Sequence, residues 1–179
     1  MDNFKKWASI NFPLWARLVL TIIVGGSIFA WLLPWLLTNV LPRLDKTLGL
    51  PSLYFGLPNK IIGWALLAVG VFFAVWSIGQ QLFKAQGTPI PVMATQKLLI
   101  RGVFKYCRNP MGFGAICMYL GCTVLAGSIC SLLAVILFSG LFILYIKKIE
   151  EKELTLRFGE EYEAYKKSTP FIIPRFFGH

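Results

Sequence analysis

Three short motifs in the second half of the chain contain the residues whose types could do chemistry. They are Gly87-Thr88-Pro89-Ile90-Pro91, then Arg108-Asn109-Pro110, and finally the acidic pair Glu150-Glu151. An arginine side chain can bind a carboxylate through two parallel hydrogen bonds. A glutamate can bind a cation or accept a proton from a reacting group. An asparagine can donate and accept hydrogen bonds, although it cannot carry a proton near neutral pH.

Each motif also has a structural explanation when it is taken alone. Proline and glycine end helices and make turns. An arginine at a membrane boundary binds lipid headgroups. Acidic residues among lysines on an exposed helix form a solvated face with ion pairs one turn apart. The motifs therefore indicate a function only in combination, and only if the helices between them bring them together.

The composition is that of a membrane protein. The chain has 179 residues, of which 56% are hydrophobic, and a mean hydropathy of +0.66. Soluble domains are usually about 45–50% apolar. The net charge of +10 is explained by lysines and arginines that face anionic lipid headgroups, so no nucleic-acid partner is expected. The four cysteines form no Cys-x-x-Cys pair and the single histidine is terminal, so no metal site is expected.

Hydrophobic segments predict an all-α fold of about four transmembrane helices. A full span needs about 20 apolar residues. The third segment is shorter and is joined to the fourth by the turn at residues 126–128, which predicts a helical hairpin. The chain is expected to form a single integral membrane domain, residues 1–179, with the first segment interrupted at Pro34. The predicted spans are approximately residues 14–40, 61–83, 111–125 and 129–148.

Basic residues predict the orientation in the membrane. The connection 84–110 carries five basic residues and no acidic residue, and Lys5 and Lys6 precede the first span. Positive charge collects on the cytoplasmic side. An even number of spans then places both termini, the 84–110 connection and the tail 149–179 in the cytoplasm, most simply that of a prokaryotic cell. The spans contain few ionisable groups, which argues against a transporter.

The tail is expected to contain a short amphipathic helix. Gly159 interrupts the helical pattern that continues from the fourth span, and residues 160–167 follow it. Tyr162 and Tyr165 lie on one stripe of this helix, with Lys166 on the solvated side. Such a helix is suited to lying on the membrane surface. Gly114, Cys117 and Gly121 fall at helical spacing on the third helix and are expected to form a small-residue face, where helices can approach closely.

In combination, the motifs resemble a known group of membrane enzymes. The chain reads Gly-Thr-Pro-x-Pro, then Leu-x-x-x-Gly-x-x-x-Tyr-x-Arg-Asn-Pro-Met, then the hairpin. It ends with Glu-Glu-x-x-Leu-x-x-x-Phe-Gly-x-x-Tyr-x-x-Tyr. Over about residues 80–174, this order resembles the isoprenylcysteine carboxyl methyltransferase and phospholipid methyltransferase superfamily.

The resemblance implies an S-adenosylmethionine site formed by the loop and the tail. Arg108, Asn109 and Glu151 are the implied catalytic residues. Asn109 stands where the family often has histidine, and Gly112 stands where it often has tyrosine. These departures leave open how proton transfer and the contact of that tyrosine are supplied. The residues implied to bind the cofactor are Leu99, Gly102, Phe104, Tyr106, Arg108, Asn109, Pro110, Glu150 and Glu151.

The implied reaction is methyl transfer to a lipophilic acceptor that enters from the bilayer. The acceptor would be a prenylcysteine-like carboxylate or a phospholipid-like amine. The Glu pair suits the amine of the cofactor, and Arg108 suits its carboxylate. Two alternatives remain at this stage. One is a sterol-reductase-like enzyme that uses NADPH, and the other is a four-span scaffold protein without catalysis. The sequence does not indicate the oligomeric state.

Overall fold

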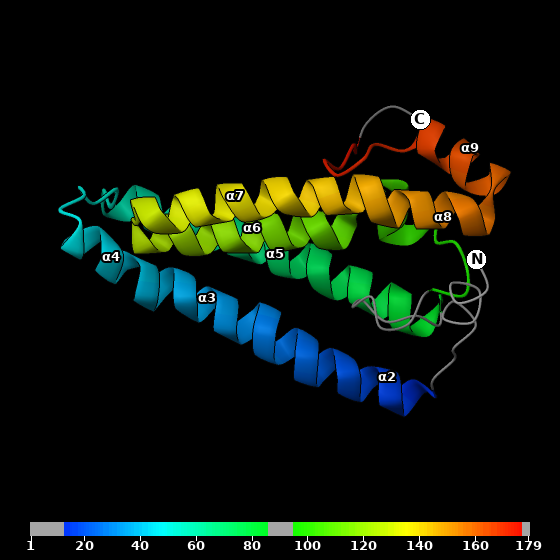
Figure 1. Ribbon diagram of the computed structural model, residues 1–179, viewed down its shortest axis with the longest axis horizontal. Coiled ribbons are helices and arrows are strands. Elements are labelled where there is room, and N and C mark those ends of the chain that lie inside the picture. The colour runs from blue at the N-terminus through cyan, green and yellow to red at the C-terminus, as the bar shows by residue number, and fades with distance from the viewer. Residues whose placement is uncertain (1–12, 86–94, 177–179) are drawn as a thin grey trace.

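All regular elements in the described part of the chain are helices (Figure 1). The computed structural model describes residues 13–85 and 95–176. Three helices, Leu14–Thr47, Leu57–Phe83 and Ile129–Phe158, are long and apolar enough to cross a membrane. The fourth, α6 (Pro110–Ala126), is apolar but has only 17 residues. The predicted all-α membrane fold is confirmed, with three full-length spans and one shorter helix.

The first long helix continues through Pro34, where the sequence predicted an interruption. A proline inside a helix removes one backbone donor and crowds the preceding turn. The helix accommodates Pro34 by forming wider, π-helical turns on both sides. On the following turn, the Thr38 hydroxyl donates to the Pro34 carbonyl at 2.8 Å. The consecutive parts are α2 (Leu14–Leu20), η1 (Thr21–Leu32), α3 (Leu33–Trp35), η2 (Leu36–Val40) and α4 (Leu41–Thr47).

Glycines hold α5 (Leu57–Phe83) and α6 together as an antiparallel pair. A Cβ atom added at Gly70 would lie 2.5 Å from the backbone nitrogen of Met118, and one added at Gly114 would lie 2.7 Å from the carbonyl oxygen of Gly70. Two helical turns away, a Cβ atom at Gly121 would lie 2.8 Å from the carbonyl oxygen of Gly63. The small-residue face expected on the third helix is therefore confirmed, and glycines of α5 complete it.

Polar contacts fix the end of the bundle at which α6 turns into α7 (Ile129–Tyr145). The Asp45 carboxylate accepts hydrogen bonds from the backbone nitrogens of Ile129 at 3.1 Å and Cys130 at 2.9 Å. A carboxylate there balances the positive end of the helix dipole. The buried Asn59 side chain donates to the carbonyl of Val124 at 2.7 Å. Because this end is fixed, the opposite end presents α5, α6 and α7 in a defined register.

The last long helix runs past the membrane-spanning length and then reverses. It consists of α7, η4 (Ile146–Glu150) and α8 (Glu151–Phe158). Gly159, with a φ of +53°, makes the turn into α9 (Glu160–Ser168), which lies beside α8 in Figure 1.

The aromatic stripe of α9 faces the protein, so the expectation that it lies on the membrane was wrong. Tyr162 and Tyr165 are 1% and 7% exposed. They pack in one cluster with Phe73 of α5 and with Val103 and Phe104 of the short 3₁₀ turn η3. This turn supplies an apolar surface that the sequence pattern of α9 alone could not reveal. Its bounds are Gly102–Lys105.

The glycine contacts predict that Gly70→Ala destabilises the protein. The added methyl group meets backbone atoms of α6, which cannot move aside as a flexible side chain can. Overpacking of this kind lowers the free energy of unfolding by about 1–3 kcal/mol. We expect a lower melting temperature in detergent. Gly79→Ala is the matched control, because Gly79 lies on the same helix and has open space around its Cα. Equal melting temperatures for the two variants would contradict the proposed close contact.

Candidate functional site

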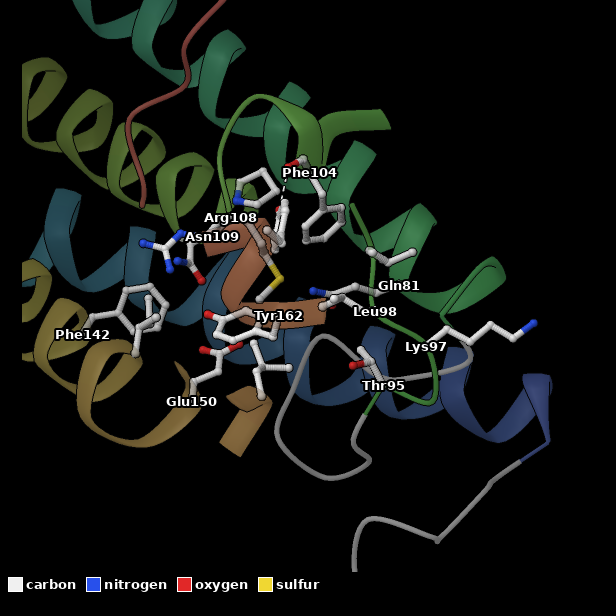
Figure 2. A pocket seen from close by; sticks show the side chains of 17 residues that line it. Gln81, Thr95, Lys97, Leu98, Phe104, Arg108, Asn109, Phe142, Glu150 and Tyr162 are labelled. Atoms are coloured by element: carbon white, nitrogen blue, oxygen red, sulfur yellow. Dashed lines mark hydrogen bonds between the residues drawn. The ribbon is translucent and has the colours of Figure 1, made fainter. Parts of the chain in front are cut away.

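A cavity lies at the end of the bundle where α5 ends, α6 begins and the last long helix leaves its apolar segment (Figure 2). In Figure 2, Phe142 lies at one end of the lining residues, and Thr95 and Lys97 lie at the other. Arg108, Asn109 and Glu150 lie near Phe142 in this view, so charged and apolar side chains share that part of the lining. It is lined by Gln81, Thr95, Lys97, Leu98, Leu99, Phe104, Arg108, Asn109, Pro110, Met111, Gly112, Phe142, Ile146, Glu150, Leu154, Tyr162 and Tyr165.

Arg108 is held just before the first residue of α6. Its guanidinium forms an ion pair with Glu151 through Nη1, and each side chain is only 10% exposed. Its Nε atom is buried and has no hydrogen-bond partner among the described residues. Buried N–H groups are almost always paired. Arg108 therefore has an unused donor at the cavity wall, which suits an anionic group of a ligand.

Glu151 lies behind Arg108 and does not line the cavity. Its second carboxylate oxygen is 3.8 Å from the Lys166 ammonium. Lys166, expected on the solvated face of the tail helix, thus takes part in the same charge cluster. Both oxygens of Glu151 face protein cations, so the side chain balances charge within the protein. Glu151 was implied as a catalytic and cofactor-binding residue; its contacts in the ligand-free structure are those of a residue that supports Arg108.

Glu150 is the acidic side chain of the cavity. The apolar part of its helix ends at Ile146 and two lysines follow, so Glu150 lies outside the membrane-spanning segment. Burial raises the pKa of its carboxyl to about 7, and the nearby carboxylates of Glu153 and Glu151 add to this rise. No donor contacts the Glu150 carboxylate within residues 13–85 and 95–176. It can therefore exist in either protonation state near neutral pH and is available to a cationic ligand.

Asn109 is oriented by the last segment of the chain. Its Nδ2 atom donates to the carbonyl of Phe171 at 2.9 Å. Asn109 also lines the cavity, and its amide oxygen can accept a hydrogen bond from a ligand there.

Tyr162 and Tyr165 are cavity residues that the sequence reasoning did not identify. The Tyr165 hydroxyl donates to the Phe104 carbonyl at 2.6 Å, which ties α9 to η3. Burial raises the pKa of both phenols, and the Glu151 carboxylate adds to the rise at Tyr162. Both are therefore neutral at physiological pH. Their three-residue spacing in the tail was the available signal, but it was interpreted as a membrane-facing stripe.

The other implied cofactor residues divide into two groups. Leu99, Phe104 and Pro110 line the cavity, whereas Gly102 and Tyr106 do not. Gly102 has a φ of +66° and lies against the Gln80 side chain, so a side chain there would be strained and would clash. Tyr106 packs beside the rings of Trp76 and Phe176. The Gly87-Thr88-Pro89-Ile90-Pro91 motif lies outside the described residues.

Phe142 occupies the space beside Gly112. A Cβ atom at Gly112 would lie 2.9 Å from Cε1 of the Phe142 ring. The tyrosine that relatives often carry at this position would not fit while Phe142 keeps its present place. Phe142, Met111 and Ile146 form an apolar wall of the cavity, next to the membrane-spanning part of α7. This wall suits an apolar acceptor, and Phe142 lies near Arg108, Asn109 and Glu150 in Figure 2.

Comparisons with known proteins relate the chain to membrane methyltransferases. A sequence model of the phospholipid methyltransferase family matches residues 58–161, from the start of α5 into α9. The chain is also 23% identical to methanethiol S-methyltransferase 2 of Bradyrhizobium diazoefficiens over 177 residues, which cover 97% of this chain and 54% of that protein. The chain thus spans about half the length of this curated relative. No solved structure matches it.

The ion pair predicts that Glu151→Gln lowers the stability of the protein. The variant leaves the Arg108 guanidinium in a buried site without its carboxylate. This should lower the free energy of unfolding by roughly 3 kcal/mol. We expect a clear decrease in melting temperature in detergent, even without a ligand. Glu161→Gln, which changes an exposed carboxylate of α9, should leave the melting temperature unchanged. A Glu151→Gln variant as stable as the wild type would show that the pair contributes little.

Proposed function

Because the chain belongs to the phospholipid methyltransferase family, we propose that it transfers a methyl group from S-adenosylmethionine to a lipophilic acceptor. One observation carries the proposal. Among the described residues, the cavity combines an arginine that has an unused buried N–H group with a glutamate that no donor contacts, and both lie beside an apolar wall. A ligand with a carboxylate, an ammonium and a reactive group between polar and apolar surroundings would match this arrangement.

The cavity residues fit the amino-acid end of this cofactor. S-adenosylmethionine carries a carboxylate, an ammonium and a sulfonium. Arg108 suits the carboxylate, because guanidinium binds carboxylates directionally. Glu150 suits the ammonium, since Glu151 is already engaged by Arg108 and Lys166. The cavity volume of about 90 Å³ is below the roughly 300–1,000 Å³ of sites that enclose a whole ligand. It therefore accounts for this end of the cofactor and not for all of it.

The residues of the chain promote the reaction by alignment. A bound cofactor would supply an electrophilic methyl group, which would pass to the acceptor while S-adenosylhomocysteine leaves. Arg108 and Glu150 would hold its amino-acid end, while Phe142 and Ile146 of the apolar wall would exclude water. Fixing two reactants in this way can supply much of the rate of a displacement reaction. A carboxylate acceptor needs no base; for a protonated acceptor, Glu150 is the cavity carboxylate that has a pKa near neutrality.

We propose that the acceptor is apolar and reaches the cavity from the bilayer. The apolar wall, formed by Met111, Phe142 and Ile146, supports this proposal. The name of the bacterial relative indicates a small thiol as its acceptor. A prenylcysteine-like carboxylate, a phospholipid-like amine and a small thiol are therefore the classes to compare. Most basic residues of the described chain lie at the cavity end, which supports a cytoplasmic cavity and both termini in the cytoplasm. The bacterial source of the relative supports a prokaryotic cell membrane.

Calorimetric titration with S-adenosylhomocysteine, the stable reaction product, tests the proposed function. We expect saturable binding at micromolar concentrations by the purified protein, and strong weakening in Arg108→Ala. Transfer of a labelled methyl group to the three acceptor classes would then identify the substrate. No binding by protein that melts cooperatively, in lipid as well as in detergent, would refute the proposal.

The Glu150 carboxyl predicts that this binding depends on pH. Its pKa is raised to about 7, so the group is mostly protonated at pH 6 and mostly charged at pH 8. Only the charged form attracts the ammonium, and affinity for S-adenosylhomocysteine should therefore increase about tenfold from pH 6 to pH 8. Glu150→Gln should bind weakly and lose this dependence, whereas the exposed-site control Glu160→Gln should keep it. A wild-type affinity that does not change with pH would argue against this role of Glu150.

A further inference from the structure

The last described residues of the chain return to the segment that carries the candidate site. The backbone nitrogen of Arg108 donates to the carbonyl of Pro170 at 2.8 Å, and that of Arg175 donates to the carbonyl of Tyr106 at 3.0 Å. These bonds join two irregular segments more than 60 residues apart. The family match ends at residue 161, so it does not include this C-terminal segment, residues 169–176.

Phe171 makes the central contacts of the C-terminal segment. Its carbonyl oxygen accepts two hydrogen bonds from Asn109, one from the backbone nitrogen at 3.2 Å and one from Nδ2 at 2.9 Å. Its ring centre lies 5.5 Å from Cζ of Arg108 and 4.9 Å from Nζ of Lys147. One residue thus contacts both polar residues of the Arg108-Asn109-Pro110 motif and a cation of the last long helix.

The ring restricts the arginine in a way that the ion pair alone does not. Glu151 binds one end of the Arg108 guanidinium through Nη1, and Tyr162 interacts with the same side chain. The Phe171 ring adds a contact of a different kind. A cation over an aromatic face has a preferred position, and partly buried contacts of this kind are energetically significant. Held by both contacts, the guanidinium keeps Nε in the buried position where it has no partner among the described residues.

We propose that Phe171 is a positioning residue of the cofactor site: its ring fixes Arg108 and its carbonyl fixes Asn109. This inference rests on the proposed function, because the group that Arg108 awaits is taken to be the cofactor carboxylate. Fixing a flexible side chain before binding removes part of the entropic cost of ordering it. The C-terminal segment then contributes to the binding site through Phe171.

The test measures how Phe171 and Arg108 depend on each other. Phe171→Leu keeps the backbone carbonyl and removes the aromatic face. We expect it to weaken S-adenosylhomocysteine binding about three- to thirtyfold, the range for a partly desolvated cation–π contact. Phe171→Tyr should restore most of the affinity. Ile173→Ala, on the same segment with a side chain 73% exposed, should bind as the wild type does.

A double-mutant cycle separates positioning from general structural support. In an Arg108→Gln background, Phe171→Leu should cause little further loss, because the residue through which it acts has been removed. Equal losses in both backgrounds, or a Phe171→Tyr variant as weak as Phe171→Leu, would overturn the proposal.

A ligand-free cycle keeps this inference distinct from the proposed function. The same four proteins can be compared by melting temperature, where the ring–guanidinium contact predicts a combined loss smaller than the sum of the single losses. If the wild type binds no S-adenosylhomocysteine, the proposed function fails. The melting cycle then still decides whether Phe171 holds Arg108, and strictly additive shifts would show that it does not.

Discussion

The ion pair between Arg108 and Glu151 joins the two parts of the chain on which the candidate site depends. Arg108 precedes α6, and Glu151 begins α8 at the far end of the hairpin. Two charges so little exposed to water are stable only together, because either one alone would keep most of its desolvation cost. Each therefore restricts where the other can be. The cavity wall between them, including Glu150 and Asn109, is a consequence of that mutual restriction.

Adjacent acidic residues have different surroundings because successive residues of a helix point in different directions. Glu150 faces the cavity, and Glu151 faces Arg108 and Lys166. The π-helical turn η4, which ends at Glu150, contributes to this arrangement, since a wider turn shifts the angular position of every residue after it. Such turns often occur at functional sites. One carboxylate is left available to a ligand while its neighbour is neutralised inside the protein.

The sequence predicted the helices and the meeting of its polar motifs better than it predicted the surroundings of the site. Long apolar segments and the hairpin turn follow from hydrophobicity alone, and a hairpin must bring Arg108 and Glu151 to the same end. The place of α9 could not be predicted in this way, because an aromatic stripe can face lipid or protein equally well. The role of Phe171 was also hidden, since its contacts join the end of the chain to residues more than 60 positions earlier. The interruption predicted at Pro34 does not occur, because the helix widens into π-helical turns on both sides of it.

The contact between Gly112 and Phe142 implies that the residues at these two positions must change together. The ring of Phe142 takes the space that a larger residue at position 112 would need. A relative with tyrosine at position 112 must then have a smaller residue, or a displaced one, opposite it on α7. The two positions should therefore covary, with one bulky side chain supplied by either helix. If the bulky side chain came from α6 in one relative and from α7 in another, the two cavities would have the same volume but walls of different polarity. That difference would allow related enzymes to diverge in the acceptors they use.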